Sequence, residues 1–213
     1  TVSSFLEKEL SVWAEKGVIG QETRWIAFHE RLEKSTAKLV GALPSEVVVM
    51  NALTVNIHFL LVSFYQPNEK RYKIMIEKDA FPSDHYAIQS QIRFHGYDPE
   101  QALVELVPRK DEKTLRNDDI LSSIQDHGDQ LSLIYLGGVN YYTGQAFDMG
   151  EISKAGKAQG AIVGFNLAHS VGNLPLRLHD WDIDFSAWCT YKYLCAGPGS
   201  PSGVFIHERH HNW

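Results

Sequence analysis

The chain has 213 residues, of which 44% are hydrophobic and 22% are charged, and its formal net charge is −6. This composition is typical of a globular protein with a sizeable core. Acidic and basic residues are mixed and form no basic stripe, so we expect no nucleic-acid partner. No apolar run reaches the roughly 18 residues of a spanning helix, so we expect no membrane segment. Cys189 and Cys195 lie close together, which predicts buried thiols in a reducing cytoplasm.

The first 41 residues predict two helices. Ser4 and Glu7 have the spacing of a capping box ahead of an apolar helical face, and Gly17 ends this first helix. A second helix is expected from about residue 25 to residue 40, closed by Gly41.

Apolar strands and helices then alternate to the end of the chain. Solidly apolar strands separated by helices predict an α/β fold with a parallel sheet covered on both faces. In such sheets ligands bind beyond the carboxyl ends of the strands. The expected strands are 47–50, 72–76, 103–107, 131–136, 161–165, 184–188 and 203–207, and the expected helices are about 53–65, 81–96, 118–127 and 148–159.

Lys192 is the sole Asp, Glu, Lys or Arg residue between positions 185 and 207. A lysine among aromatic residues either extends its ammonium group to water or is desolvated. Desolvation favours the neutral amine that Schiff-base chemistry requires. A loop rich in glycine and proline follows at 197–203, and such a loop lets backbone approach a ligand closely. These features make Lys192 the first candidate for a catalytic residue.

Phe81, Ser83 and Asp84 follow one expected strand and open the next helix. A structural interpretation makes Ser83 or Asp84 the N-cap and places Phe81 in the core. A functional interpretation uses Phe81 as an aromatic face for a ring, and the first N–H groups of the helix for a phosphate. The sequence leaves both interpretations open.

Histidines follow two of the later strands. His169 is placed at a helix start, where a structural role is commoner than a catalytic one. His207, His210 and His211 are bunched near the end, but zinc would need further ligands and the order is not His-Glu-x-x-His. We therefore expect a solvated tail and no metal site.

The sequence lacks the usual motifs of nucleotide binding and of cysteine-nucleophile catalysis. Neither Gly-x-x-x-x-Gly-Lys-Ser/Thr nor Gly-x-Gly-x-x-Gly after a strand is present, which disfavours nucleotide-binding folds. Cys189 lies three residues before Lys192, but no histidine partner can be assigned to it, so a cysteine nucleophile is not expected.

Five sequence blocks occur in order, at or near the ends of expected strands: 50–56, 80–86, 137–145, 188–194 and 203–208. Together they resemble kynureninase, a family of fold-type-I enzymes in the aminotransferase class V group that use pyridoxal 5′-phosphate (PLP). The resemblance covers nearly the whole chain and is nearest to the bacterial branch. It implies that residues 1–213 form the PLP-binding large domain, with a mostly parallel central sheet. The family's N-terminal segment and C-terminal small domain are missing. Since the chain also starts at Thr1, we expect an internal segment of a longer protein.

The same resemblance implies a cytoplasmic homodimer acting in tryptophan catabolism. Its small-molecule substrate would be L-kynurenine, 3-hydroxykynurenine or both, hydrolysed to the corresponding anthranilate and L-alanine. PLP is the implied cofactor, with Lys192 binding it covalently and moving a proton between substrate and cofactor. The other implied cofactor-binding residues are Leu53 and Thr54 at the phosphate, Phe81 on the ring, Ser83 and Tyr191 around the cofactor, Asp84 and Asn166 near the ring, and His169 at its polar edge.

Asn166 departs from the family, which has aspartate at this position. A carboxylate there keeps the ring nitrogen protonated, whereas an amide can form a hydrogen bond but no ion pair. Two readings follow: an active hydrolase of which this is a segment, or a non-catalytic or incomplete relative that still binds PLP. A third, a cysteine desulfurase of the same class, is disfavoured by blocks 80–86 and 188–194.

Overall fold

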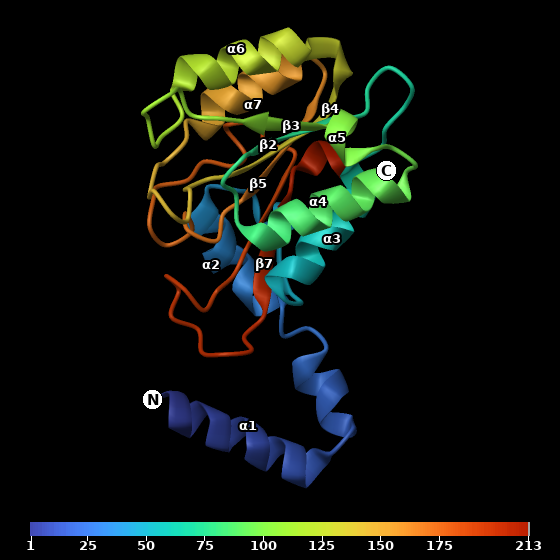
Figure 1. The fold of residues 1–213 in the computed structure, drawn as a ribbon. Helices are drawn as coiled ribbons and strands as arrows, with labels where there is room; N and C mark the ends of the chain where they lie inside the picture. The colour runs from blue at the N-terminus through green and yellow to red at the C-terminus, as the bar shows by residue number, and fades with distance from the viewer. Residues whose placement is uncertain (213) are drawn as a thin grey trace.

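A computed structural model describes residues 1–212, apart from the side chains of residues 23 and 24. A seven-stranded sheet in the order β1-β7-β6-β5-β4-β2-β3 forms the centre, with helices on both faces (Figure 1). The strands are β1 (Val47–Met50), β2 (Lys73–Glu77), β3 (Leu103–Leu106), β4 (Leu131–Gly137), β5 (Ile162–Asn166), β6 (Phe185–Trp188) and β7 (Ser202–Ile206). The helices are α1 (Val2–Lys16), α2 (Glu30–Val40), α3 (Leu53–Phe64), α4 (Pro82–Phe94), α5 (Pro99–Ala102), α6 (Asn117–His127) and α7 (Met149–Ala158).

Strand direction brings most loops of interest to one edge of the sheet. Strands β3, β2, β4, β5 and β6 are parallel, and β7 runs antiparallel to both β6 and β1. Strand β1 therefore runs in the same direction as β6. The carboxyl ends of β1, β2, β4, β5 and β6 meet at the edge where β7 begins, so the prediction of a mostly parallel α/β sheet is confirmed.

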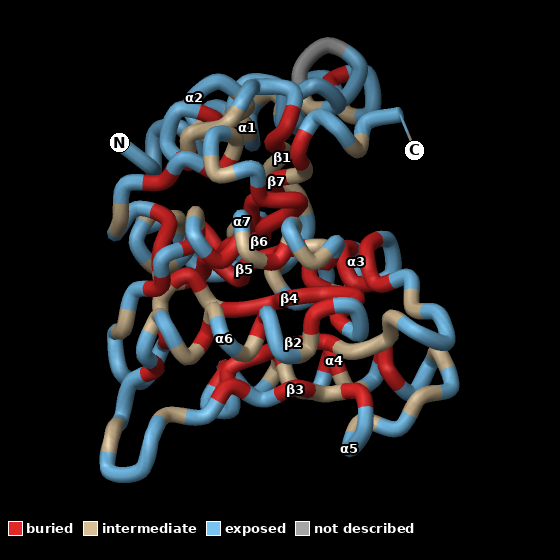
Figure 2. The backbone as a smooth tube through the Cα atoms, turned by 90° about the horizontal axis from the view of Figure 1, so that it is seen from above, coloured by how far each residue is buried: buried red, intermediate tan, exposed pale blue. Residues whose placement is uncertain are grey.

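The sheet separates two hydrophobic clusters, as expected for strands buried on both faces. Residues of α2, α6 and α7 pack with one face, and residues of α3 and α4 pack with the other. Strand β4 shows the alternation: Leu133 and Tyr135 belong to the second cluster, Ile134 and Leu136 to the first. Figure 2 shows the buried residues gathered along the central strands. The edge of the sheet where the strand ends meet is therefore anchored to strands that are packed on both faces.

Every expected strand is present, with bounds shifted by at most one residue. The second helix ends as predicted, because Gly41 takes a left-handed conformation (φ 65°). A Cβ there would lie 2.3 Å from the backbone oxygen of Leu176, so only glycine fits without a shift. No helix within residues 1–212 has the length and apolarity needed to cross a membrane.

Predictions for the N-terminal region were less accurate. The first helix is capped by Thr1, whose side chain accepts from the N–H of Ser4, and not by Ser4 with Glu7. The second helix begins at Glu30, because residues 21–25 form a π-helical turn. Helix α1 contains no buried residue and projects from the body (Figure 1). With no buried residue to select a boundary, the start of this helix depends on local capping alone, and Thr1 caps it three residues before Ser4.

Candidate active site

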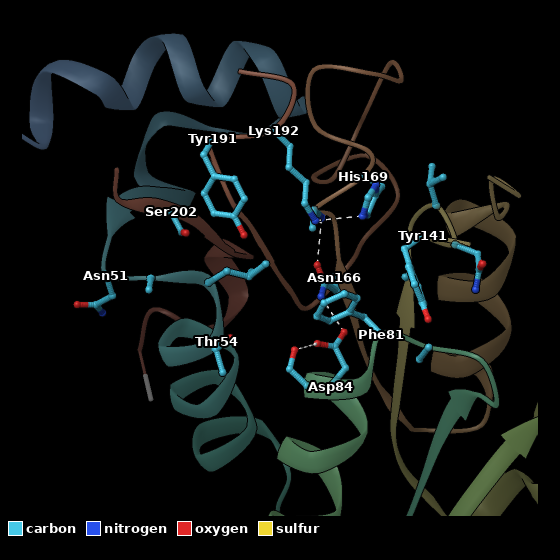
Figure 3. A pocket seen from close by; sticks show the side chains of 18 of the residues that line it. Asn51, Thr54, Phe81, Asp84, Tyr141, Asn166, His169, Tyr191, Lys192 and Ser202 are labelled. Carbon is cyan, nitrogen blue, oxygen red and sulfur yellow. Dashed lines mark hydrogen bonds between the residues drawn. The ribbon is translucent and has the colours of Figure 1, made fainter. Parts of the chain in front are cut away.

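A cavity of about 650 Å³ lies at the edge where the strand ends meet. This volume is in the range of small-molecule binding sites. The cavity is lined by all nine residues singled out from the sequence: Leu53, Thr54, Phe81, Ser83, Asp84, Asn166, His169, Tyr191 and Lys192. Figure 3 shows the labelled side chains of this set converging from α3, α4 and the loops after β5 and β6. Residues up to 139 positions apart in sequence are thus brought to one chamber.

The start of α3 forms one end of the chamber. Helix α3 has no side-chain cap, so the N–H groups of Leu53 and Thr54 in its first turn are available to a ligand. Asn56 fixes this junction: its amide donates to the Met50 carbonyl across 2.9 Å and accepts from Asn51 across 3.1 Å. A helix start of this kind favours an anionic group such as a phosphate.

The start of α4 forms a second wall. Phe81 occupies the N-cap position and Pro82 opens the helix, so neither Ser83 nor Asp84 is the cap. The Phe81 side chain is 48% exposed and lies edge-on to Tyr141, with ring centroids 5.2 Å apart. The structural interpretation of this motif is therefore wrong in both parts. The Phe81 ring is instead free to meet a ligand in the cavity.

Asp84 and Asn166 form a buried pair on the cavity floor. The Asn166 amide nitrogen donates to the Asp84 carboxylate across 2.7 Å, and the amide oxygen accepts from the N–H of Ala168 across 3.0 Å. Because a carboxylate only accepts and an N–H only donates, these partners fix the orientation of the amide. Burial raises the pKa of Asp84, against hydrogen bonds from Asn166 and Ser83 that lower it.

Glu77, at the end of β2, is a buried cavity residue that sequence reasoning missed. Its carboxylate accepts from the Gly137 N–H across 2.7 Å and from the Asn140 amide across 3.4 Å. Burial raises the pKa of Glu77 to about 7, and the charge of Asp84 adds to the rise, while these hydrogen bonds oppose it. Its position at the carboxyl end of an apolar strand was the available signal.

Lys192 reaches the cavity from the loop after β6. Its Nζ lies 3.0 Å from His169 Nε2 and 5.9 Å from the centroid of the Phe81 ring (Figure 3). His169 sits in a turn after β5 and not at a helix start. Burial and the charge of Lys192 both lower the pKa of His169, which favours the neutral imidazole. The amine is thus held at the cavity surface beside a neutral imidazole that can accept a hydrogen bond from it.

The donor set fits a small, flat, anionic ligand that reacts with an amine. Lys192 supplies the amine, Phe81 an aromatic face, and the start of α3 an anion site. Ser202, also in the cavity wall, has a buried hydroxyl oxygen without a hydrogen-bond partner among the described residues. An orphaned polar atom at such a place is explained by a ligand that supplies the missing bond.

Of the three histidines near the end of the chain, His211 is exposed as expected for a solvated tail, but His207 and His210 pack against the body. His207 is buried, and Glu46, His179 and His207 bring one potential ligand atom each within 4.8 Å. The Glu46 carboxylate, however, already accepts from His179 across 2.9 Å and from the Glu208 N–H across 2.9 Å. His210 lies 2.8 Å from the Asp184 carboxylate. His207 and His210 therefore hold the C-terminal segment to the body through polar contacts with Glu46 and Asp184.

The two cysteines differ in burial. Both are free thiols, but Cys189 is buried and Cys195 is exposed, so the expectation of two buried thiols holds for Cys189 alone. Cys195 also has a positive φ of 56° and lies in the loop after β6.

Residues 5–206 match the family model described as aminotransferase class-V. The chain belongs to this family. Among curated relatives, the kynureninases of Flavobacterium johnsoniae and Koribacter versatilis are 55% and 56% identical, over 98% and 99% of this chain and 50% of each relative. The kynureninase of Mus musculus is 49% identical over 98% of this chain and 46% of its own length. The chain spans about half the length of the curated relatives it matches.

Solved structures of class-V proteins share this fold. A cysteine desulfurase from Thermococcus onnurineus NA1 matches with a TM-score of 0.72 and 22% identity, over 84% of this chain and 42% of its own. The cystine C–S lyase C-DES, in complex with cysteine persulfide, matches with a TM-score of 0.78 and 18% identity, over 96% and 54%. Another structure of this lyase carries glycine covalently linked to its PLP cofactor.

Proposed function

We propose that the protein is a PLP-dependent hydrolase of the kynureninase type. Its reaction would be the hydrolysis of L-kynurenine, of 3-hydroxykynurenine or of both, to the corresponding anthranilate and L-alanine. The observation that carries the proposal is the amine of Lys192 at the cavity surface, beside His169 and over the Phe81 ring. The 49–56% identity to curated kynureninases over nearly the whole chain supports the same activity. It also favours this activity over a cysteine desulfurase, which shares the fold at 22% identity.

PLP suits the cavity because each of its chemical groups meets a matching protein group. The first turn of α3, with Leu53 and Thr54, supplies N–H groups and a hydroxyl for the phosphate. Phe81 offers its face to the pyridine ring, and Ser83 and Tyr191 help to seat the cofactor from the adjoining walls. When bound, PLP acts as an electron sink for bonds at the substrate α-carbon.

The remaining residues handle charge and protons. Lys192 would bind the cofactor through its amine and would then carry a proton to or from the substrate α-carbon. His169, which also lines the cavity, would contact the polar edge of the ring. Asp84 and Asn166, a hydrogen-bonded pair, would lie near the ring nitrogen, with Asp84 rather than residue 166 as the group that can carry a negative charge. The protein thereby orients the cofactor and sets the charge around its ring.

We further propose a homodimer. Val55, Phe59 and Val62 recur along α3 at helical spacing and are 43%, 56% and 53% exposed. A second copy of the chain is the proposed cover for this stripe, since apolar stripes of this kind mark interaction surfaces. A cytoplasmic location is proposed on the two free cysteines, which suit a reducing compartment.

The decisive experiment uses the full-length protein that contains this chain. Borohydride reduction after incubation with PLP, followed by peptide mapping, should place the pyridoxyl group on Lys192. The Lys192→Ala variant should lose the label, whereas Lys110→Ala, at an exposed lysine outside the cavity, should retain it. A label on another lysine would refute the assignment. Labelling of Lys192 without release of anthranilate from kynurenine would support instead a non-catalytic relative that binds PLP.

A further inference from the structure

The contact between Lys192 and His169 constrains where the imidazole carries its proton. The two nitrogens, Lys192 Nζ and His169 Nε2, are 3.0 Å apart. A lysine ammonium group has three donors and no acceptor, so Nε2 must accept if the lysine is charged. The proton of a neutral imidazole then sits on the opposite nitrogen, Nδ1.

Tyr193 lies at that opposite nitrogen. Its hydroxyl oxygen is 3.3 Å from His169 Nδ1, and the two rings are 6.0 Å apart at an angle of 68°. A phenol oxygen can accept a hydrogen bond as well as donate one. Tyr193, His169 and Lys192 therefore form a continuous chain of polar contacts that ends at the amine in the cavity.

The fold brings these residues together through a close approach of two loops. Gly172 has a φ of +83°, and a Cβ there would lie 3.1 Å from both the Cβ and the backbone oxygen of Tyr193. Any larger residue would push the loop after β6 away from the loop after β5. The Asn173 side chain also donates to the His169 carbonyl across 3.1 Å, which fixes the turn that carries the imidazole.

We propose that Tyr193 is a positioning residue for the amine of Lys192. By accepting a hydrogen bond from His169 Nδ1, it keeps Nε2 unprotonated, and Nε2 then accepts the hydrogen bond that holds the lysine nitrogen at the cavity surface. Tyr193 thus acts through His169 and is not among the residues that line the cavity. This inference rests on the proposed function, in which the Lys192 amine captures PLP.

The neighbouring charges favour this arrangement. Burial and the positive charge of Lys192 both lower the pKa of His169, so the imidazole stays neutral and able to accept near pH 7. The reverse arrangement, with the proton on Nε2, would set two donors against each other while Lys192 is charged.

The first arm of the test reads the proton position directly. In the cofactor-free full-length protein with 15N-labelled histidine, imidazole nitrogen shifts should show His169 with its proton on Nδ1. The Tyr193→Phe variant removes the acceptor and should move a measurable fraction of His169 to the Nε2-protonated form. Tyr142→Phe is the matched control, because Tyr142 is 81% exposed and outside the cavity, and it should change nothing.

The second arm measures how fast added PLP is captured at Lys192, by quenching with borohydride and quantifying the label. Capture should slow about fivefold in Tyr193→Phe, the factor that one hydrogen bond of ordinary strength represents. An Nε2-protonated His169 in the unmodified protein, or an unchanged tautomer in Tyr193→Phe, would overturn the inference. If Tyr193→Phe shifts the His169 tautomer as expected but PLP is not captured at Lys192 in any form of the protein, the proposed function is refuted. The role of Tyr193 in positioning the lysine amine would then still stand.

Discussion

The Asn166 amide nitrogen donates a hydrogen bond to the Asp84 carboxylate across 2.7 Å, linking the end of β5 to the first turn of α4. The amide cannot carry the negative charge that an aspartate would have at this position. Asp84 is therefore the partner through which a charge can act on the proposed cofactor ring. The reactivity of the site therefore depends on how well Asp84, hydrogen-bonded to Asn166, replaces an ion pair between residue 166 and the ring nitrogen.

Replacing Asn166 by aspartate in the full-length protein should raise the rate of anthranilate release. A fixed carboxylate would keep the ring nitrogen protonated, and an electrostatic partner of this kind contributes about 3 to 4 kcal/mol to the barrier, or roughly two to three orders of magnitude in rate. PLP affinity should change little, because Thr54, Phe81 and Lys192 are unaltered. Equal turnover by the two forms would show that Asp84 already supplies the required charge.

The same substitution should destabilise the cofactor-free protein near neutral pH. Asn166→Asp replaces a donor by a second carboxylate beside Asp84, whose pKa burial already raises. Two buried carboxylates at this distance cannot both ionise cheaply, so we expect a loss of about 1 to 3 kcal/mol in the free energy of unfolding. Urea denaturation at pH 7 with and without PLP measures it. An equal loss in the free energy of unfolding when PLP is bound would contradict this explanation.

The framework of the fold could be predicted because its signals are local. Solid apolar runs bounded by glycine and polar residues gave the strands to within one residue, and strand direction then placed the cavity loops together. The nature of the C-terminal segment could not be predicted in this way. His207 and His210 meet Glu46 and Asp184, partners 161 and 26 residues away, and no local pattern encodes such contacts. Glu77 was missed because its burial depends on Gly137 and Asn140 from another strand end.

The Glu46–His179 ion pair should stabilise the folded protein only within a limited pH range. Burial alone would raise the pKa of Glu46, but hydrogen bonds from Leu43, His179 and Glu208 lower it overall. The stability that Glu46 contributes is therefore present above its ordinary value of 4.5 and is lost as pH falls. The hydrogen bond to Glu46 raises the pKa of His179, so its contribution is present below 6.5 and is lost as pH rises.

Glu46→Gln should accordingly lower the free energy of unfolding most between about pH 4.5 and pH 6.5, by about 1 to 3 kcal/mol. Denaturation in urea over a pH series gives the comparison. Asp119→Asn is the control, because it breaks the exposed ion pair with Arg109, and exposed pairs contribute little. A Glu46→Gln effect that stays constant from pH 4 to pH 8 would argue against the ion pair.

The apolar stripe on α3 gives a test of the homodimer. Val62→Glu places a charge in the proposed interface and should shift the full-length protein from dimer to monomer in sedimentation velocity. Val107→Glu is a matched control, since Val62 and Val107 are 53% and 54% exposed and only Val62 lies on the stripe. Dimers that persist in Val62→Glu would place the interface elsewhere.

The last prediction concerns Glu77, whose pKa burial raises to about 7. The folded protein then binds a proton at Glu77 that the unfolded chain has released, so stability falls as pH rises from about 4.5 to 7. A shift of this size corresponds to about 3 kcal/mol. Glu77→Gln cannot ionise, so its free energy of unfolding should lose this decline, whereas Glu77→Asp should keep a pH-dependent decline.

The Glu77→Gln variant should also separate stability from activity. Glutamine can still accept from the Gly137 N–H, but its amide nitrogen faces the Asn140 amide with two donors opposed. The turn that carries Tyr141 beside Phe81 should loosen and turnover should fall about tenfold, although the stability of the variant no longer declines between pH 4.5 and pH 7. Urea titrations at pH 4.5 and pH 8, run beside anthranilate assays, measure both effects. If the free energy of unfolding changed equally between pH 4.5 and pH 8 in Glu77→Gln and in the unmodified protein, Glu77 would not hold its proton in the folded state.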